Sequence, residues 1–245
     1  MSELFLPGLA DPDAAATVRR HGHSPEAAAA QATAVFARLY AALAKAGGGS
    51  GDVCKITMQI TDRAFRQAVY DVLGRSLPGV FPVSTGLIVK GLTNPDTLFQ
   101  LDAHVVLGGP HDRFRRYRST DAPYGLQKQP FVMDFCMVVQ AGRRIYLRGQ
   151  TGLALDGRFI GLNDAGTQAR QAAANVQLLL ADVAADLSNA TRLVVYVTDR
   201  AHLTPVLTAV EPAFAAAPVA STELVVKGLA APELLMEIDV HAMLP

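Results

Sequence analysis

The sequence repeats itself at a constant spacing. The segment VSTGLIVKGL (83–92) returns as ASTELVVKGL (220–229), an offset of 137 residues. The same offset pairs FQLDAHVVL (99–107) with MEIDVHAML (236–244) and, without a gap, Gln31 with Gln168. A constant offset over such a length is the signature of two tandem copies of one structural unit. We therefore predict an amino-terminal domain at residues 1–107, a connector at 108–130 and a carboxy-terminal domain at 131–245.

Each copy has the pattern helix, strand, helix, strand, strand. In copy one a helix is expected to start at Ser24-Pro25-Glu26, because a capping hydroxyl, a proline in the first turn and an acidic residue all favour a helix start. The last two strands, 84–90 and 98–106, are expected to pair as a closing hairpin. The other expected elements are strands at 53–61 and 192–198 and helices at 64–73, 167–183 and 203–215. This order predicts the α+β class, with each domain a mostly antiparallel sheet that carries two helices on one face.

The two copies differ at their beginnings. Copy two opens with FCMVVQAGRRIYLRGQTG (135–152), which is typical of a β-hairpin. Residues 1–23, the corresponding part of copy one, show no such pattern. The first domain is therefore expected to have a degenerate opening hairpin.

Composition excludes several classes of protein. Half of the residues are hydrophobic and the formal net charge is zero, so we expect a folded core and no general attraction to nucleic acid. No apolar stretch approaches the roughly 18 residues that span a bilayer, and no signal peptide is visible. Cys54 and Cys136 are too few for a disulfide framework or a zinc site. A cytoplasmic protein without metal or membrane contact is expected.

Acidic and imidazole side chains alternate along the last strand of each copy. Asp102 and His104 share one face in copy one, and Asp239 and His241 share it in copy two, while apolar residues occupy the other face. These pairs either form structural hydrogen bonds or make a site in which the carboxylate orients a proton-exchanging imidazole. Ser84 could complete a triad with Asp102 and His104, but it lies on a plain strand with no elbow turn.

Copy two resembles the reactive intermediate deaminase (Rid, or YjgF) superfamily over residues 119–244, and copy one resembles it less completely over 24–107. The resemblance rests on the order of APYGLQKQPFVMDFCMVVQAGRRIYLRGQTG, TQARQAAANVQLLLADV, LVVYVTD, PVASTELVVKGL and LLMEIDVHAML. It implies two tandem chorismate-mutase-like domains. It also implies a homo-oligomer, with a trimer favoured, whose substrate pockets lie in clefts between subunits.

The resemblance further implies hydrolysis of a small enamine or imine to a carbonyl compound and ammonia, with no cofactor. In the family, an arginine that binds the substrate carboxylate precedes the Ser/Thr of the closing strands. Val83 and Ala220 occupy that position here, so we expect an atypical substrate. Arg148 is one possible replacement.

The site residues follow from the resemblance. Glu237 matches the family's pocket glutamate, and copy one has Gln100 in its place. The expected catalytic residues are Glu237, Asp239 and His241. The expected substrate-binding residues are Tyr124, Arg148, Gly149, Gln150, Ser221 and Thr222, with Ser84, Asp102 and His104 as candidates in copy one.

Two other readings stay open. In one, the chain keeps the fold without the reaction, as a ligand-binding or scaffold protein. In the other, it is an amide or ring hydrolase that uses the Asp–His pair.

Overall fold

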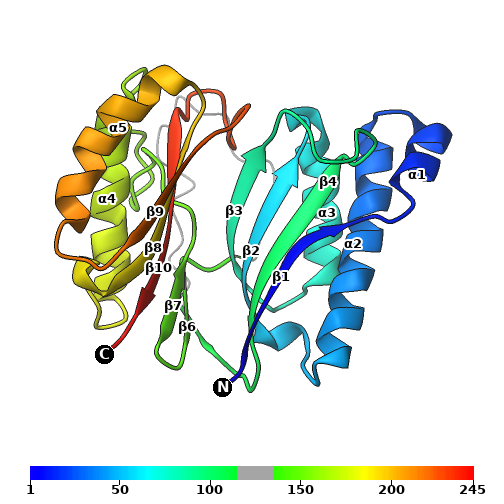
Figure 1. The fold of residues 1–245 in the computed structure, drawn as a ribbon, viewed down its shortest axis with the longest axis horizontal. Helices are drawn as coiled ribbons and strands as arrows, with labels where there is room; N and C mark the ends of the chain where they lie inside the picture. Colours follow the sequence, from blue (N-terminus) through cyan, green and yellow to red (C-terminus); the bar gives the residue numbers. More distant parts are fainter. Residues whose placement is uncertain (115–134) are drawn as a thin grey trace. The chain divides into compact units, whose positions relative to one another are not determined.

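A computed structural model describes residues 1–114 and 135–245. The chain divides into two compact units, one made of residues 1–111 with Phe135 and the other of residues 112–114 with 136–245. Each unit has a single sheet with helices on one face, in agreement with the predicted α+β class (Figure 1). The predicted domain boundaries at 107 and 131 stay predictions.

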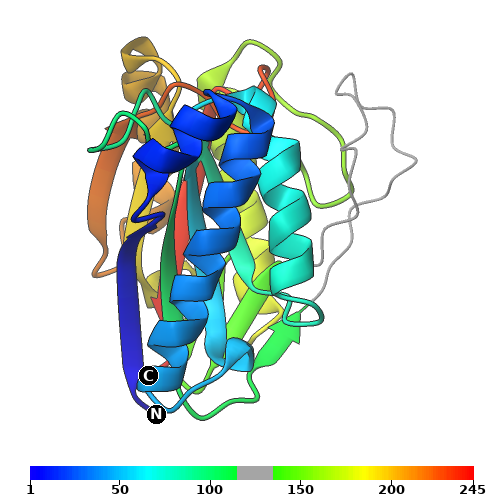
Figure 2. The ribbon, with the colours of Figure 1, turned by 90° about the vertical axis from the view of Figure 1, so that its right-hand side faces the viewer.

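The first unit contains a four-stranded sheet in the order β1-β4-β2-β3. Figure 2 shows α2 and α3 side by side against this sheet. Its elements are β1 (Glu3–Ala10), α1 (Ala14–His21), α2 (Pro25–Lys45), β2 (Val53–Ile60), α3 (Arg66–Ser76), β3 (Val83–Ile88) and β4 (Phe99–Val106), with short 3-10 turns at Ser50–Asp52 and Arg63–Phe65.

The second unit contains a six-stranded sheet in the order β5-β6-β7-β10-β8-β9. Its elements are β5 (Asp112–Phe114), β6 (Val138–Ala141), β7 (Arg144–Leu147), α4 (Ala165–Ala181), β8 (Ala190–Val197), α5 (Leu203–Val210), β9 (Ala220–Val225) and β10 (Met236–Met243), with 3-10 turns at Leu187–Asn189, Arg200–His202 and Glu211–Phe214. The hairpin β6–β7 is the opening hairpin that the sequence predicts.

The main helices start at side-chain caps. The Ser24 hydroxyl accepts a hydrogen bond from the Ala27 N–H at 3.2 Å, which confirms the predicted start of α2. Asp164 plays the same part for α4, because it accepts a hydrogen bond from the Thr167 N–H at 3.0 Å. Hydrogen bonds from the hydroxyl and the N–H of Thr167 also hold the pKa of Asp164 below its usual value.

The alternation on the last strand of each copy is confirmed. Phe99, Leu101 and Ala103 of β4 are buried in the same core as residues of α2 and α3. Ile238 and Val240 of β10 occupy the equivalent place against α4 and α5. The opposite face of each strand therefore carries the polar residues.

The predicted closing hairpin is wrong in both copies. Strand β3 pairs in parallel with β2, and β2 lies between β3 and β4. Strand β9 pairs in parallel with β8 in the same way. The reason is the crossover: α3 and α5 are long enough to return the chain beside the strand that precedes them, and a strand joined through such a crossover runs parallel.

The start of copy one, where the sequence predicts a degenerate opening hairpin, contains one strand that is equivalent to a strand of copy two. Phe5 of β1 lies opposite His104 of β4, and Tyr146 of β7 lies opposite His241 of β10. The stretch ELFLPGLA (3–10) therefore matches RIYLRGQT (144–151) at an offset of 141 instead of 137. Copy one keeps this strand of the opening hairpin.

One expectation about membranes also needs correction. Within the described residues, α2 is long and apolar enough to cross a bilayer by length and composition, because its 21 residues include an 18-residue window with a mean hydropathy of 1.3. Its Val35, Phe36 and Leu39 are buried in the core of the first unit. A core helix passes the same test, so the finding is weak evidence for a membrane span.

Candidate functional site

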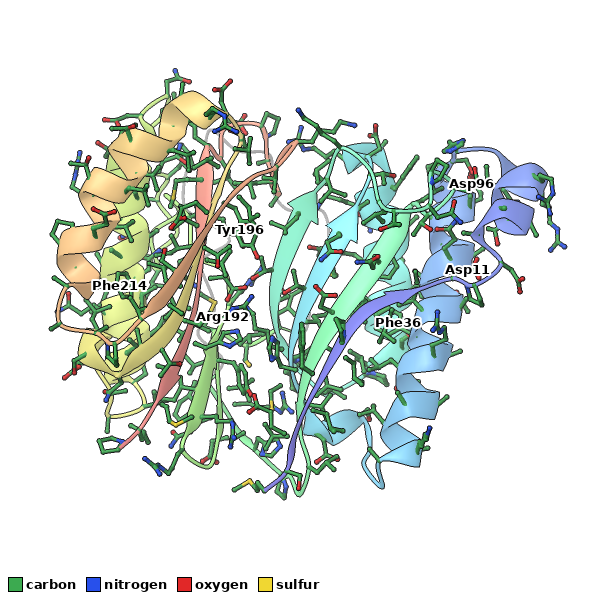
Figure 3. The ribbon with its side chains drawn as sticks, viewed as in Figure 1. Asp11, Phe36, Asp96, Arg192, Tyr196 and Phe214 are labelled. Carbon is green, nitrogen blue, oxygen red and sulfur yellow. The ribbon has the colours of Figure 1, made fainter. Side chains whose placement is uncertain are left out.

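The polar face of the second sheet gathers residues from its central strands. On β10, Glu237, Asp239 and His241 alternate with core residues, and their register partners on β8 are Tyr196, Val194 and Arg192. Figure 3 shows Arg192 and Tyr196 on the side of the strands away from the helices, whereas Phe214 lies on the helix side. The predicted catalytic residues thus share one face with a tyrosine and an arginine.

Glu237 lies directly against the backbone that follows β7. A Cβ atom added at Gly149 would lie 1.8 Å from Oε1 of Glu237, so the carboxylate occupies the space that any other side chain at 149 would fill. The backbone of Gln150 exchanges two hydrogen bonds with Ile238, each of 2.8 Å, and holds this segment against β10. The Gln150 amide donates to the Arg148 carbonyl oxygen at 2.7 Å. Glu237 is 5% exposed, so its carboxylate is both fixed and nearly buried.

Asp239 and His241 are close enough to interact. Oδ1 of Asp239 lies 3.8 Å from Nε2 of His241, and the Asp239 side chain is 2% exposed. The ring of Tyr146 meets the His241 ring edge-on, with 5.0 Å between centroids. An imidazole between an aspartate and an aromatic ring is oriented by both.

The two predicted residues of β9 lie on different faces of the sheet. Thr222 is in register with Val194, on the face of Asp239, whereas Ser221 is in register with Leu193, which belongs to the helix-covered core. The Ser221 hydroxyl donates to Glu223 Oε1 at 2.5 Å. Tyr124 lies outside the described residues.

In copy one, Gln100 and Asp102 of β4 belong to a series of hydrogen bonds within the sheet. Asp102 accepts from the Gly8 N–H at 2.7 Å and from the Gln59 amide at 2.9 Å, and Gln59 accepts from the Gln100 amide at 2.7 Å. These bonds tie β1, β4 and β2 together. The ring of Phe5 stacks on His104 at 4.5 Å. Asp102 therefore has a structural partner on each carboxylate oxygen.

Copy one also differs at the positions around the carboxylate. By the offset of 141, Leu9 stands where copy two has Gln150 and Pro7 stands where it has Arg148, while Gln100 replaces Glu237. Ser84 is not brought to Asp102 and His104, because it is in register with the core residue Ile56 and so lies on the helix-covered face.

Sequence reasoning missed Arg192, Tyr196 and Tyr146 as members of this face. Successive side chains of a strand point to opposite faces of the sheet, so the position of each of the three along its strand assigns it to a face. This alternation does not predict which strands pair, and only the pairing places the three residues beside His241 and Glu237.

Other possible sites are weaker. An open hollow of about 490 Å³ lies beside α4, lined by Ala154, Leu155, Asp156, Arg158, Gln171, Asn175 and Leu178. None of the predicted site residues lines it. Within residues 1–114 and 135–245, no three His, Cys, Asp or Glu side chains are placed to hold a metal ion.

Comparisons with known proteins agree with this architecture. A crystal structure of a chorismatase superimposes over 86% of this chain and 69% of its own, with a TM-score of 0.67 and 16% identity, which shows the tandem fold. A Rid-family protein of unknown function from Yersinia pestis is 30% identical, with 44% of this chain and 86% of that chain covered and a TM-score of 0.40. A YjgF-family member from Mycobacterium tuberculosis is 28% identical, with 45% and 86% covered and a TM-score of 0.40.

The family model described as endoribonuclease L-PSP matches residues 127–244, which is nearly the whole of copy two. No functionally curated protein matches the chain. With the family model over copy two, the Yersinia relative and the repeat in copy one, the chain is a tandem-repeat member of the Rid/YjgF family.

Proposed function

We propose that copy two is a Rid-type deaminase that hydrolyses a small enamine or imine to a carbonyl compound and ammonia. The observation that carries the proposal is the Glu237 carboxylate, which is nearly buried and fixed against Gly149. A fixed carboxylate in a water-poor site is suited to hold and deprotonate an attacking water.

The reaction needs only proton transfers and one water. Protonation of the enamine carbon gives an iminium ion, and water adds to its carbon while Glu237 takes a proton from the water. Return of that proton to the nitrogen lets the carbinolamine expel ammonia as its hydroxyl loses a proton, which leaves the carbonyl group and restores the proton used in the first step. The Asp239–His241 pair is placed to supply and return protons on the same face, since imidazole exchanges protons near neutral pH. No step requires a metal or an organic cofactor.

Several further expectations belong to this proposal. The chain is a cytoplasmic homo-oligomer, with a trimer of chains favoured, and its substrate is a small molecule. Gly149, Gln150 and Thr222 support or line the site, and Tyr124 stays a predicted substrate-binding residue. The description of the family model names RNA cleavage, but a formal net charge of zero gives this chain no general attraction to a polyanion.

The test is ammonia release from 2-aminoacrylate that is generated enzymatically in the assay. Glu237→Gln keeps the shape and removes the base, so kcat should fall roughly 10²-fold or more. The matched control is Gln100→Leu at the equivalent position of copy one, which should leave kcat within about twofold.

Three outcomes contradict the proposal. Equal rates for Glu237→Gln and the parent would remove Glu237 from the reaction. Absence of activity on any small enamine would favour the scaffold reading. If the parent hydrolyses amides or rings, and His241→Ala is inactive while Glu237→Gln is active, the hydrolase reading holds instead.

A further inference from the structure

The carboxylate of Asp52 holds the segment through which the chain leaves the first unit. Asp52 is the last residue of the 3-10 turn that precedes β2. Its Oδ1 accepts a hydrogen bond from the Gly109 N–H and its Oδ2 accepts one from the Gly49 N–H, both at 2.9 Å. Gly109 belongs to the exit segment, residues 107–111, which joins β4 to β5 of the second unit. One carboxylate therefore ties the exit segment to the turn before β2.

The imidazole of His111 fastens the end of the same segment. Its Nε2 lies 2.6 Å from the Val106 carbonyl oxygen, and the side chain is 9% exposed. Since a carbonyl oxygen only accepts, Nε2 carries the proton in this bond, and Nδ1 is the atom that takes up a further proton. A Cβ atom added at Gly109 would lie 3.2 Å from Oδ1 of Asp52 and 3.7 Å from Nε2 of His111. The carboxylate and the imidazole are therefore close neighbours.

The equivalent turn of copy two separates the two tasks of the Asp52 carboxylate. The offset of 137 pairs Asp52 with Asn189 and Gly49 with Asp186. The Asn189 side chain accepts a hydrogen bond from the Asp186 N–H at 2.9 Å, so a neutral amide is enough to close this turn. The second oxygen of the Asp52 carboxylate bonds to Gly109 instead. The charge of Asp52 thus serves the exit segment and is not needed for the turn.

The charges of Asp52 and His111 act on each other. Burial raises the pKa of Asp52, but the N–H groups of Gly109 and Gly49 and the charge of His111 outweigh it and hold the pKa below its usual value. Because this pKa is lowered, the carboxylate stabilises the fold above the usual pKa of an aspartate, and this contribution is lost as the pH falls through the lowered value. An imidazole gains its charge near neutral pH. The two groups are therefore oppositely charged at mildly acidic pH.

We propose that Asp52 and His111 form a pH-sensitive latch that holds the exit segment on the first unit, and that protonation of His111 tightens it. Above neutral pH, hydrogen bonds alone hold the segment. At mildly acidic pH the attraction between imidazolium and carboxylate is added. The latch sets how firmly the chain is held where it passes into β5, and it does not depend on the reaction at Glu237.

Other titratable groups lie near the exit segment and have to be separated from His111. Glu3 of β1 is in register with Val106, and the Met1 side chain approaches Gly108. The groups to be separated are the amino group of Met1 and the side chains of Glu3, Lys45 at the end of α2 and Asp112. A variant that removes the imidazole alone leaves all of them in place.

Amide hydrogen exchange at Gly109 measures the latch directly and needs no turnover. It is followed by NMR in the full chain and corrected for the intrinsic pH dependence of exchange. In the parent, protection of Gly109 should be roughly 1.5- to 5-fold higher at pH 6 than at pH 8, the range of a partly exposed ion pair. His111→Gln should remove this difference, because its amide still donates to the Val106 carbonyl oxygen but does not titrate. The matched control is the exposed His23, since His23→Gln should keep the difference.

Asp52→Asn tests the carboxylate, because it places in copy one the side chain that copy two has at Asn189. Protection of Gly109 should fall roughly 10-fold or more, the effect of a hydrogen bond to a charged group, and protection of Gly49 should stay within about threefold. Equal protection of Gly109 in the parent and in Asp52→Asn would overturn the latch, and so would a pH difference that persists in His111→Gln. If Asp52→Asn does not fold, His111→Gln decides the proposal by itself.

Discussion

At the scale of single residues, the site of copy two depends on the absence of a side chain at Gly149. The Glu237 carboxylate fills the position of the missing Cβ, so the glycine sets where the proposed base lies. Its counterpart in copy one is Gly8, whose N–H donates to Asp102 and whose added Cβ would come no closer than 3.9 Å to the Gln100 side chain. The two equivalent glycines therefore differ in role: Gly149 leaves space for a carboxylate, and Gly8 donates a backbone hydrogen bond.

Gly149→Ala should lower kcat roughly 10²-fold, because a methyl group at 1.8 Å from Oε1 must displace the carboxylate by an ångström or more. Steady-state ammonia release gives the rate, and circular dichroism checks the fold. Gly91→Ala is the control, since a Cβ there meets nothing within 4 Å. Full activity in Gly149→Ala would show that the position of Glu237 does not limit the reaction.

At the scale of elements, a buried glutamine fastens the main helix of each copy to the chain that enters its last strand. The Gln31 amide donates to the Asp96 carbonyl oxygen at 2.8 Å and accepts from the Leu98 N–H at 2.7 Å. Gln168 makes the equivalent bonds to Glu233 and Leu235, both at 2.9 Å. Gln31 recurs at Gln168 because each side chain provides hydrogen-bond partners for buried backbone groups. The same bonds position the strands that carry the polar face.

Gln31→Leu should lower the free energy of unfolding by about 1–3 kcal/mol, because the buried Leu98 N–H loses its partner. Urea denaturation measures the change. The control is Gln67→Leu on the exposed side of α3, where the Gln67 amide donates to Asp71, and the expected change there is within about 0.5 kcal/mol. Similar effects at both positions would mean that the amide bonds of Gln31 contribute little.

At the scale of the whole molecule, the two copies share a fold but not a site. Copy one has Gln100, Leu9 and Pro7 where copy two has Glu237, Gln150 and Arg148. Its Asp102 and Lys55 are engaged in hydrogen bonds within the sheet. A duplicated domain in which one copy lost the reactive groups is expected to keep that copy for stability or assembly.

The chain should therefore bind one molecule of pyruvate, the 2-keto acid that 2-aminoacrylate hydrolysis would release, per polypeptide, and not two. Calorimetric titration gives the stoichiometry. Two equivalent sites per chain would place ligand binding in copy one as well and contradict the asymmetry.

The sequence by itself determined the duplication, the fold family and the face of each residue on the last strands. A gap-free offset of 137 and a strict alternation depend only on the order of residues, so they can be read without coordinates. The tertiary structure alone decided which strands are neighbours: it placed β2 between β3 and β4, set β1 beside β4, and brought Arg192 to His241. The physical reason is that strands pair through backbone hydrogen bonds between distant segments, and several alternative pairings use the same backbone groups. Parity along one strand fixes the face of a side chain, but not which strand it meets.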